Sequence, residues 1–386
     1  MYTRLSAFYL FYFLAAGVYF PFVSLFYKDL GFSGEQIGLL GALAPLAGIA
    51  LGPVWGYLAD QRGWRLPLLR WSLLLAALGA PLLLLPRSFG PVALVVGLVA
   101  LCLSPAIPLA DATTLEWVKR TGWPATYGKV RLWGAMGFIL GGLAGGRLFT
   151  LASVHLLFGV YGVLLLGPFA AALAIPARRG IGRARPRGQG HALSLLRHPV
   201  LGPFYLCSFL AYVTTASYNG FFSLYMRSLG AGSQQIGLAI AVGSVSELPV
   251  MWYSGRLIAR FGARSVVLAA LCLYTARWCL LALIHDPLLA TASQCLNGPT
   301  FGAFYVAGVT FVDSHVPADL RATGQSLYNA ATFGLAAITG SLIFGYLLDH
   351  GGVFRMYGIA SAVCAAATAL LALLVRDRVV TAAPGG

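Results

Sequence analysis

Long apolar runs follow one another along this chain, separated by short segments rich in charged residues, Gly and Pro. Each run is close to the ~20 residues that a helix needs to cross the hydrocarbon core of a bilayer. The pattern predicts an all-α membrane protein of about twelve spans. We place them near residues 5–26, 36–58, 66–86, 91–112, 128–149, 153–175, 199–226, 235–255, 265–284, 289–312, 322–348 and 354–375.

The two halves of the chain repeat each other. Shifting the sequence by 199 positions superimposes the run Gln36–Leu39 on Gln235–Leu238, and the same register continues through the next loop to Gly63 and Gly262. Both copies begin on the same membrane side, which indicates a parallel repeat about an axis along the membrane normal. We therefore expect an N-terminal six-helix bundle at 1–175, a linker at 176–198 and a C-terminal six-helix bundle at 199–386.

Composition and charge support a membrane protein and exclude a soluble one. Of the 386 residues, 59% are hydrophobic and 10% are charged, against roughly 25% charged in an average soluble chain. The net charge of +15 is concentrated in the loops of one predicted side, which is the positive-inside asymmetry and argues against nucleic acid. We expect a multi-pass plasma (inner) membrane protein, both termini cytoplasmic, with anionic lipid headgroups as counter-charge.

The loop after the second span has a distinctive pattern, with a Gly, an acid four residues later and a basic-Gly-basic turn. Here these are Gly56, Asp60, Arg62, Gly63 and Arg65. The pattern resembles the gating signature of the major facilitator superfamily and implies two six-helix bundles that rock about a central site. In the second copy the acid is replaced by Ala259, so we expect weaker charge contacts with the neighbouring helix ends there.

A narrower resemblance rests on polar residues inside the spans. Asp111 near the end of span four, Glu247 in span eight and the pair Arg277-Trp278 in span nine are similar to positions of the phenylpropionate permease family. That family is related to the lactose and nucleoside proton symporters. The resemblance implies proton-coupled uptake of a small organic solute.

Glu247 and Arg277 carry the strongest chemical signal, since ionisable groups inside a span are costly and seldom idle. Both are expected near the middle of the membrane, within reach of each other. One interpretation is a permanent ion pair that holds two helices together. The other is a switchable pair, in which protonation of Glu247 frees Arg277 and couples transport to protons.

Asp111 and Arg131 form a second candidate pair, near the inner ends of spans four and five. They are interpreted either as a salt-bridge gate or as groups that contact substrate and couple to protons. Polar residues on one face of span seven, with others in spans one, ten and eleven, are expected to line a cavity. The substrate-binding candidates are Tyr12, Tyr19, Arg131, Tyr212, Thr215, Asn219, Asn297, Tyr305 and Asn329.

No nucleotide-binding, metal-binding or nucleophile pattern occurs in the sequence, so we expect no cofactor and no enzymatic activity. The favoured function is a secondary transporter, acting as a monomer, that imports an aromatic acid, sugar or nucleoside with protons. Two alternatives stay open: an efflux permease for drugs or sugars, and a receptor or scaffold that has lost transport. The buried charges argue against the scaffold.

Overall fold

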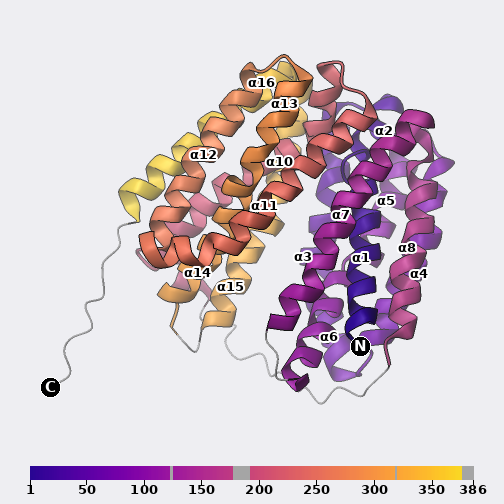
Figure 1. Ribbon diagram of the computed structural model, residues 1–386, viewed down its shortest axis with the longest axis horizontal. Helices are drawn as coiled ribbons and strands as arrows, with labels where there is room; N and C mark the ends of the chain where they lie inside the picture. The colour runs from indigo at the N-terminus through magenta and orange to yellow at the C-terminus, as the bar shows by residue number, and fades with distance from the viewer. Residues whose placement is uncertain (122–124, 177–191, 318–319, 376–386) are drawn as a thin grey trace.

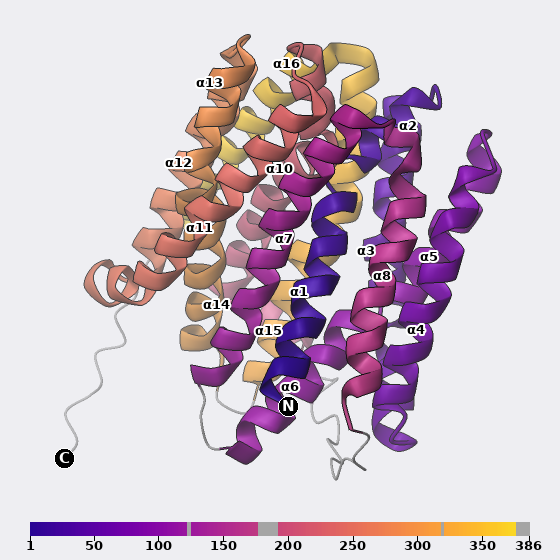
Figure 2. The same cartoon turned by 45° about the vertical axis from the view of Figure 1, so that its right-hand side comes forward.

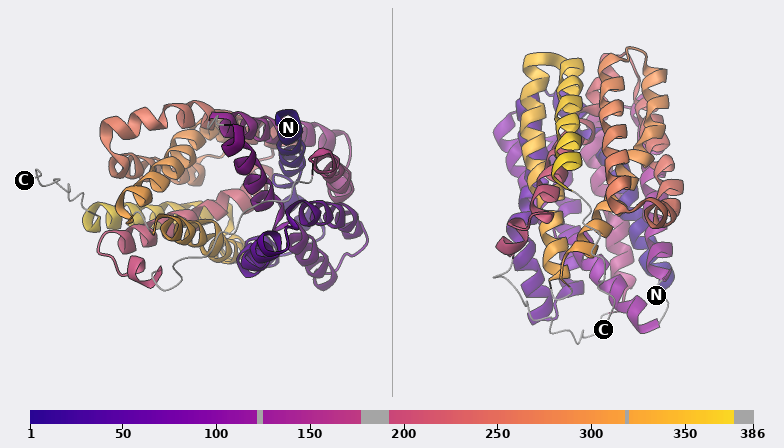
Figure 3. Two further views of the ribbon diagram at one scale, coloured as in Figure 1. Left: turned by 90° about the horizontal axis from the view of Figure 1, so that it is seen from below. Right: turned by 90° about the vertical axis from the view of Figure 1, so that its left-hand side faces the viewer.

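The structure is a computed structural model that describes residues 1–121, 125–176, 192–317 and 320–375. All regular secondary structure in these ranges is helical, and the helices stand in two groups side by side, one from each half of the chain (Figure 1, Figure 3). The first group contains α1 Tyr2–Tyr19, α2 Val23–Asp29, α3 Gly34–Gln61, α4 Arg65–Gly79, α5 Phe89–Leu103, α6 Ala106–Thr121, α7 Ala125–Leu151 and α8 Leu157–Ala174. The second contains α10 Leu201–Ser228, α11 Ser233–Phe261, α12 Ala263–Leu283, α13 Pro287–Ala292, α14 Ala303–His315, α15 Arg321–Asn329 and α16 Ala337–Leu374.

Ten helical segments of the described chain are long and apolar enough to cross a membrane. One of them, Arg321–Leu374, has 54 residues, which at 1.5 Å per residue is more than twice the ~30 Å of a bilayer core. The chain reverses within it at Gly352, where φ is 69°. The 28-residue α10 is long enough to cross as well, but its polar residues lower its hydropathy. Adding α10 to the ten segments, and counting Arg321–Leu374 as two crossings, gives the twelve crossings that the sequence predicts.

Prolines and glycines interrupt several spans. Pro21 separates α1 from α2, and Pro105 separates α5 from α6. Span ten passes from α13 through a 3-10 turn (η4, Ser293–Leu296) and a π turn (η5, Gly298–Gly302) before α14 begins. Span eleven contains a second π segment, η6 Ala330–Ala336. The apolar pattern did not reveal these breaks, although π segments are common where a helix carries functional groups.

The repeat appears in the backbone as well as in the sequence. Gly31 and Gly230, which are 199 positions apart, both have φ of 86°. Gly63 and Gly262, also 199 apart, have φ of 65° and 80°. Positive φ is costly for residues with a side chain, so each pair uses Gly for the same turn.

Arginines bind the ends of the last span in each half. Arg70 on α4 donates hydrogen bonds to the carbonyls of Ala172 and Ile175 (3.1 and 2.8 Å) at the end of α8. Arg264 on α12 does the same for Val375 and Ala372 at the end of α16. A cation at these unpaired carbonyls stabilises the C-terminal end of a helix.

Polar contacts between the two halves gather at one end of the molecule. We call this the α2 end, since it holds α2 and α13, and the opposite end, where the chain starts, the Met1 end (Figure 1, Figure 2). Asp29 pairs with Arg227 across the halves, and Asp349 accepts hydrogen bonds from the Gly34 and Glu35 amides (2.7 and 2.9 Å). The two halves are therefore joined at the α2 end.

Small residues let the halves touch at this end. In α7, Gly137 and Gly141 face α1 of the same half, whereas Gly142 and Gly146 face α11 of the other half. A Cβ added at Gly146 would lie 2.8 Å from the Ser233 carbonyl oxygen. The glycine run that the sequence shows in span five thus serves two different interfaces.

Candidate functional site

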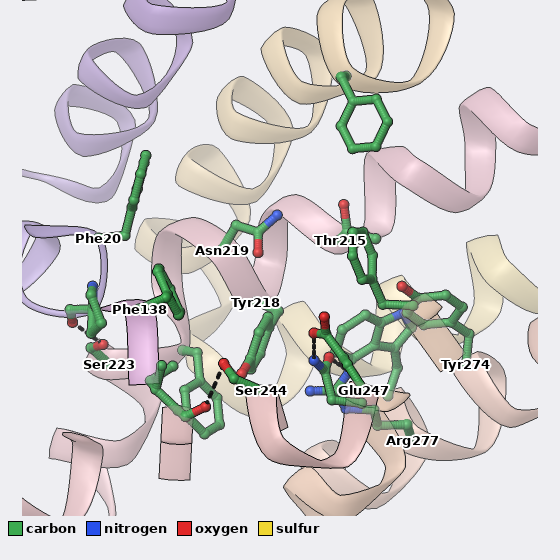
Figure 4. A pocket seen from close by; sticks show the side chains of 17 residues that line it. Phe20, Phe138, Thr215, Tyr218, Asn219, Ser223, Ser244, Glu247, Tyr274 and Arg277 are labelled. Atoms are coloured by element: carbon green, nitrogen blue, oxygen red, sulfur yellow. Dashed lines mark hydrogen bonds between the residues drawn. The ribbon is translucent and has the colours of Figure 1, made fainter. Parts of the chain in front are cut away.

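A cavity of about 220 Å³ lies between the two halves (Figure 4). The N-terminal half contributes Phe20, Pro21 and Phe138, and helices of the C-terminal half form the rest of the wall. Of the predicted site residues, the cavity brings together Thr215, Asn219, Glu247, Arg277 and Asn297. These side chains come from spans seven to ten, which is the convergence expected of a binding site between bundles.

Asn297 links the two buried charges. Its amide nitrogen donates a hydrogen bond to a Glu247 carboxylate oxygen, and its carbonyl oxygen accepts from Arg277 Nη1 at 2.6 Å. Although both charged residues lie in the described part of the chain, they form no direct ion pair. The predicted pairing of Glu247 with Arg277 is therefore wrong in its geometry, because Asn297 of span ten lies between them.

Arg277 is held by groups that the sequence reasoning had not selected. Its Nη2 donates to Gln294 Oε1 at 2.6 Å, and its Nη1 also contacts Thr300 Oγ1 at 3.3 Å. Its guanidinium carbon lies 4.6 Å from the Tyr218 ring centre and 5.1 Å from that of Trp278. Gln294 comes three residues before Asn297, and its position inside the predicted span ten is the signal that would have found it.

The break in span ten positions these groups. Asn297 lies between η4 and η5, so the backbone there departs from a regular α-helix. Gly298 brings span ten close to α11, and its amide donates a hydrogen bond to Ser246 Oγ at 2.9 Å. A Cβ added at Gly298 would collide with the Ser246 carbonyl. This close approach places Asn297 within hydrogen-bonding distance of Glu247 on α11.

The predicted stripe on span seven divides between two environments. Thr215 and Asn219 line the cavity, whereas Tyr212 is 4% exposed. The Tyr212 ring packs edge-on against Phe304 and Phe333. The prediction that Tyr212 lines the cavity is corrected, because aromatic residues of spans ten and eleven cover that part of α10.

The other substrate-binding candidates lie away from the cavity. Tyr305 stacks on Phe301, Asn329 is exposed, and Tyr19 stacks on Tyr161 with ring centres 4.6 Å apart. Tyr12 packs against Phe8 and Phe13. None of these four residues is among those that line the cavity.

Asp111 and Arg131 do not pair with each other. Asp111 accepts a hydrogen bond from the Tyr9 hydroxyl, and the Arg131 guanidinium lies over the Phe13 and Tyr9 rings at 4.6 and 5.3 Å. The predicted Asp111–Arg131 contact is thus replaced by contacts that both residues make with Tyr9 of span one. This group lies outside the cavity, toward the Met1 end.

The gating signature is only partly described. Gly63 makes the tight turn with positive φ, and the Arg62 guanidinium lies 4.9 Å from the Trp64 ring centre. Arg65 forms an ion pair with Glu116 at 2.8 Å, and Gly56 has open space around it. The side chain of Asp60 lies outside the described residues.

Comparison with known proteins agrees with the fold. A family profile described as "MFS_1 like family" matches residues 2–359. The chain is 32% identical to the maltose permease of Geobacillus stearothermophilus, covering 98% of this chain and 96% of that protein. It is 26% identical to the "Probable 3-phenylpropionic acid transporter" of Escherichia coli, covering 96% and 95%.

Solved structures show the same architecture. A crystal structure of the nucleoside transporter NupG superimposes with a TM-score of 0.89 at 16% identity, covering 97% of this chain and 100% of that one. The protein is a multi-pass membrane transporter with the major facilitator fold. Within that class, the chain belongs to the MFS_1 like family, as its sequence signature indicated.

Proposed function

We propose that this protein is a secondary active transporter that imports a small organic solute together with protons. The supporting observation is that hydrogen bonds through Asn297 connect Glu247 with Arg277 at the wall of a cavity between the two halves. An ionisable carboxyl group inside a span is expensive to maintain. Its gain or loss of a proton changes the charge at the site where the solute would bind.

The solute is a sugar, a nucleoside or an aromatic acid. The relatives named above transport maltose, 3-phenylpropionic acid or nucleosides according to their names. The cavity offers rings for stacking, among them Phe138, Tyr218 and Phe222, together with the amide of Asn219. Such a combination of apolar walls and a few polar groups is typical of small-molecule sites.

The orientation in the membrane follows from the charge bias of the sequence. With the Met1 end on the cytoplasmic side, contacts at the α2 end close the outer side, and the structure corresponds to an inward-facing state. Asp111 and its partner Tyr9 then lie on the cytoplasmic side of the cavity. We propose a monomer in the plasma membrane with the linker 176–198 in the cytoplasm, of which the structure describes the short helix α9, Ala192–Leu196.

Uptake into proteoliposomes tests the coupling. An inward-directed proton gradient should drive accumulation of a labelled sugar, nucleoside or aromatic acid above its outside concentration. Glu247→Gln retains size and hydrogen bonding but not ionisation, so it should abolish accumulation while exchange of the solute across the membrane persists. Asp313→Asn, at an acid that is 52% exposed, is the matched control and should accumulate normally.

Two results would contradict the proposal. If Glu247→Gln still accumulates solute against its gradient, Glu247 is not the coupling group. If an inward-directed proton gradient drives the solute out of the vesicles and an outward-directed gradient drives it in, the protein is a proton antiporter, which is the efflux permease.

A further inference from the structure

Arg277 is built into the wall of the cavity and is not offered to a ligand. Its side chain is 1% exposed, both terminal nitrogens donate to Gln294, Asn297 and Thr300, and the Nε is enclosed without surface or partner. The rings of Tyr218 and Trp278 lie within about 5 Å of the guanidinium carbon. These partners use three of the five guanidinium hydrogens and the Nε–H is enclosed, so little of the guanidinium is left for a substrate anion.

Glu247, in contrast, faces the cavity. One carboxylate oxygen accepts the Asn297 amide, and no described residue donates to the other oxygen, which is not among the enclosed polar atoms. Among the residues that the structure describes, Glu247 is the only acidic side chain that lines this cavity. The charged group within a ligand's reach is therefore a hydrogen-bond acceptor.

The remaining free polar group is an amide. Asn219 is exposed within the cavity, and its side chain has no hydrogen-bond partner in the described part of the chain. In the view of Figure 4, Asn219 lies above Tyr218 and Glu247 lies to the right of that ring. Aromatic rings from both halves, Phe20 and Phe138 on one side and Phe222 on the other, complete the wall.

We infer that the cavity selects neutral ring compounds that carry hydroxyl groups, and that Glu247 excludes carboxylates from it. A hydroxyl can donate to the free Glu247 oxygen, and the ring can stack on the aromatic wall. When Glu247 is ionised, a carboxylate would meet a like charge there, and like-charge contacts discriminate strongly between ligands. The nearby Arg277 offsets part of the Glu247 charge, but three of its five N–H donors are used by Gln294, Asn297 and Thr300 and its Nε is enclosed. This inference rests on the proposed function and chooses among its three solute classes.

Equilibrium binding to the full-length protein in nanodiscs tests the inference without any gradient. The probes are matched pairs that differ in charge: methyl β-glucoside with glucuronate, uridine with its 5′-carboxylate, and 3-phenylpropanol with 3-phenylpropionate. At alkaline pH, at least one neutral member should bind about tenfold or more tightly than its carboxylate partner. Glu247→Gln should weaken binding of the neutral ligand and strengthen binding of the carboxylate, so the ratio of the two affinities becomes smaller. Asp313→Asn should leave this ratio unchanged.

The inference is overturned if a carboxylate binds as tightly as its neutral partner, if no neutral member binds, or if Glu247→Gln leaves the ratio unchanged. Binding and proton-driven uptake are measured separately. A protein that keeps the neutral preference but does not accumulate solute contradicts the proposed function alone. One that accumulates 3-phenylpropionate with protons contradicts this inference alone.

Discussion

Gly146 on α7 lies at one of the close contacts between the two halves at the α2 end. A Cβ there would lie 2.8 Å from the Ser233 carbonyl oxygen and 3.2 Å from the Gln234 Cα. Both are main-chain atoms of the opposite half, which cannot rotate away as a side chain does. Gly146→Ala should therefore push the halves apart at this end.

The magnitude follows from the cost of overpacking. Adding a methyl group to a close-packed contact typically costs about 1–3 kcal/mol. If the outward-facing state lacks this contact, the whole cost shifts the equilibrium toward that state, by roughly 5- to 150-fold. Gly128, in the same helix, has no atom within 4 Å of a Cβ, so Gly128→Ala is the matched control and should shift nothing.

Reactivity of an introduced cysteine reports the shift. Ser223 is 4% exposed and donates to the Pro21 carbonyl across the halves, so Ser223→Cys in a cysteine-free background is shielded in the present state. When opening is faster than labelling, the labelling rate follows the open population. The rate should rise roughly 5- to 150-fold with Gly146→Ala. Equal labelling in the Gly146→Ala and Gly128→Ala proteins would refute the reasoning, provided that both unfold at similar temperatures.

Three further outcomes are expected. Arg277→Ala should lower the unfolding temperature, because each acceptor left without its donor costs about 1–3 kcal/mol. Arg321→Ala, at a side chain that is 54% exposed, is the control and should have little effect. Similar unfolding temperatures of the two variants would show that the buried hydrogen bonds of Arg277 do not stabilise the protein. Asn219→Ala should weaken binding of the transported solute about 2- to 12-fold, because it removes a hydrogen bond worth ~0.5–1.5 kcal/mol. Tyr212→Phe should leave the affinity unchanged. A loss of affinity in Tyr212→Phe but not in Asn219→Ala would place Tyr212 in the site. Arg183→Cys should resist impermeant labelling in intact cells, and labelling from outside would reverse the proposed orientation.

Much of the architecture could be predicted from the sequence, because lipid imposes a simple rule. Every backbone polar group inside the bilayer must be satisfied within its own segment, so each apolar run of about twenty residues must form a helix. The internal repeat could be predicted for a similar reason. Gly31 and Gly230 occupy the same turn with the same positive φ, and only Gly adopts this conformation readily.

The charged residues of the site could also be selected from the sequence. Glu247 and Arg277 interrupt apolar runs, and such residues are rare unless they have a task. Sequence periodicity placed Tyr212, Thr215 and Asn219 on one face of span seven, which is correct for an isolated helix. It could not show that Phe304 and Phe333 cover Tyr212, since covering depends on neighbouring helices.

What only the tertiary structure decided is which groups meet. Spans eight, nine and ten follow one another along the chain, but the register between the packed helices depends on contacts such as Gly298 against Ser246. That contact places Asn297 between Glu247 and Arg277, so the acid keeps one oxygen open while the arginine is enclosed. The sequence by itself therefore determined the spans, the repeat and the presence of two buried charges. The packing of the helices decided which of the two charges a solute can reach, because a hydrogen bond depends on distances that no single helix contains.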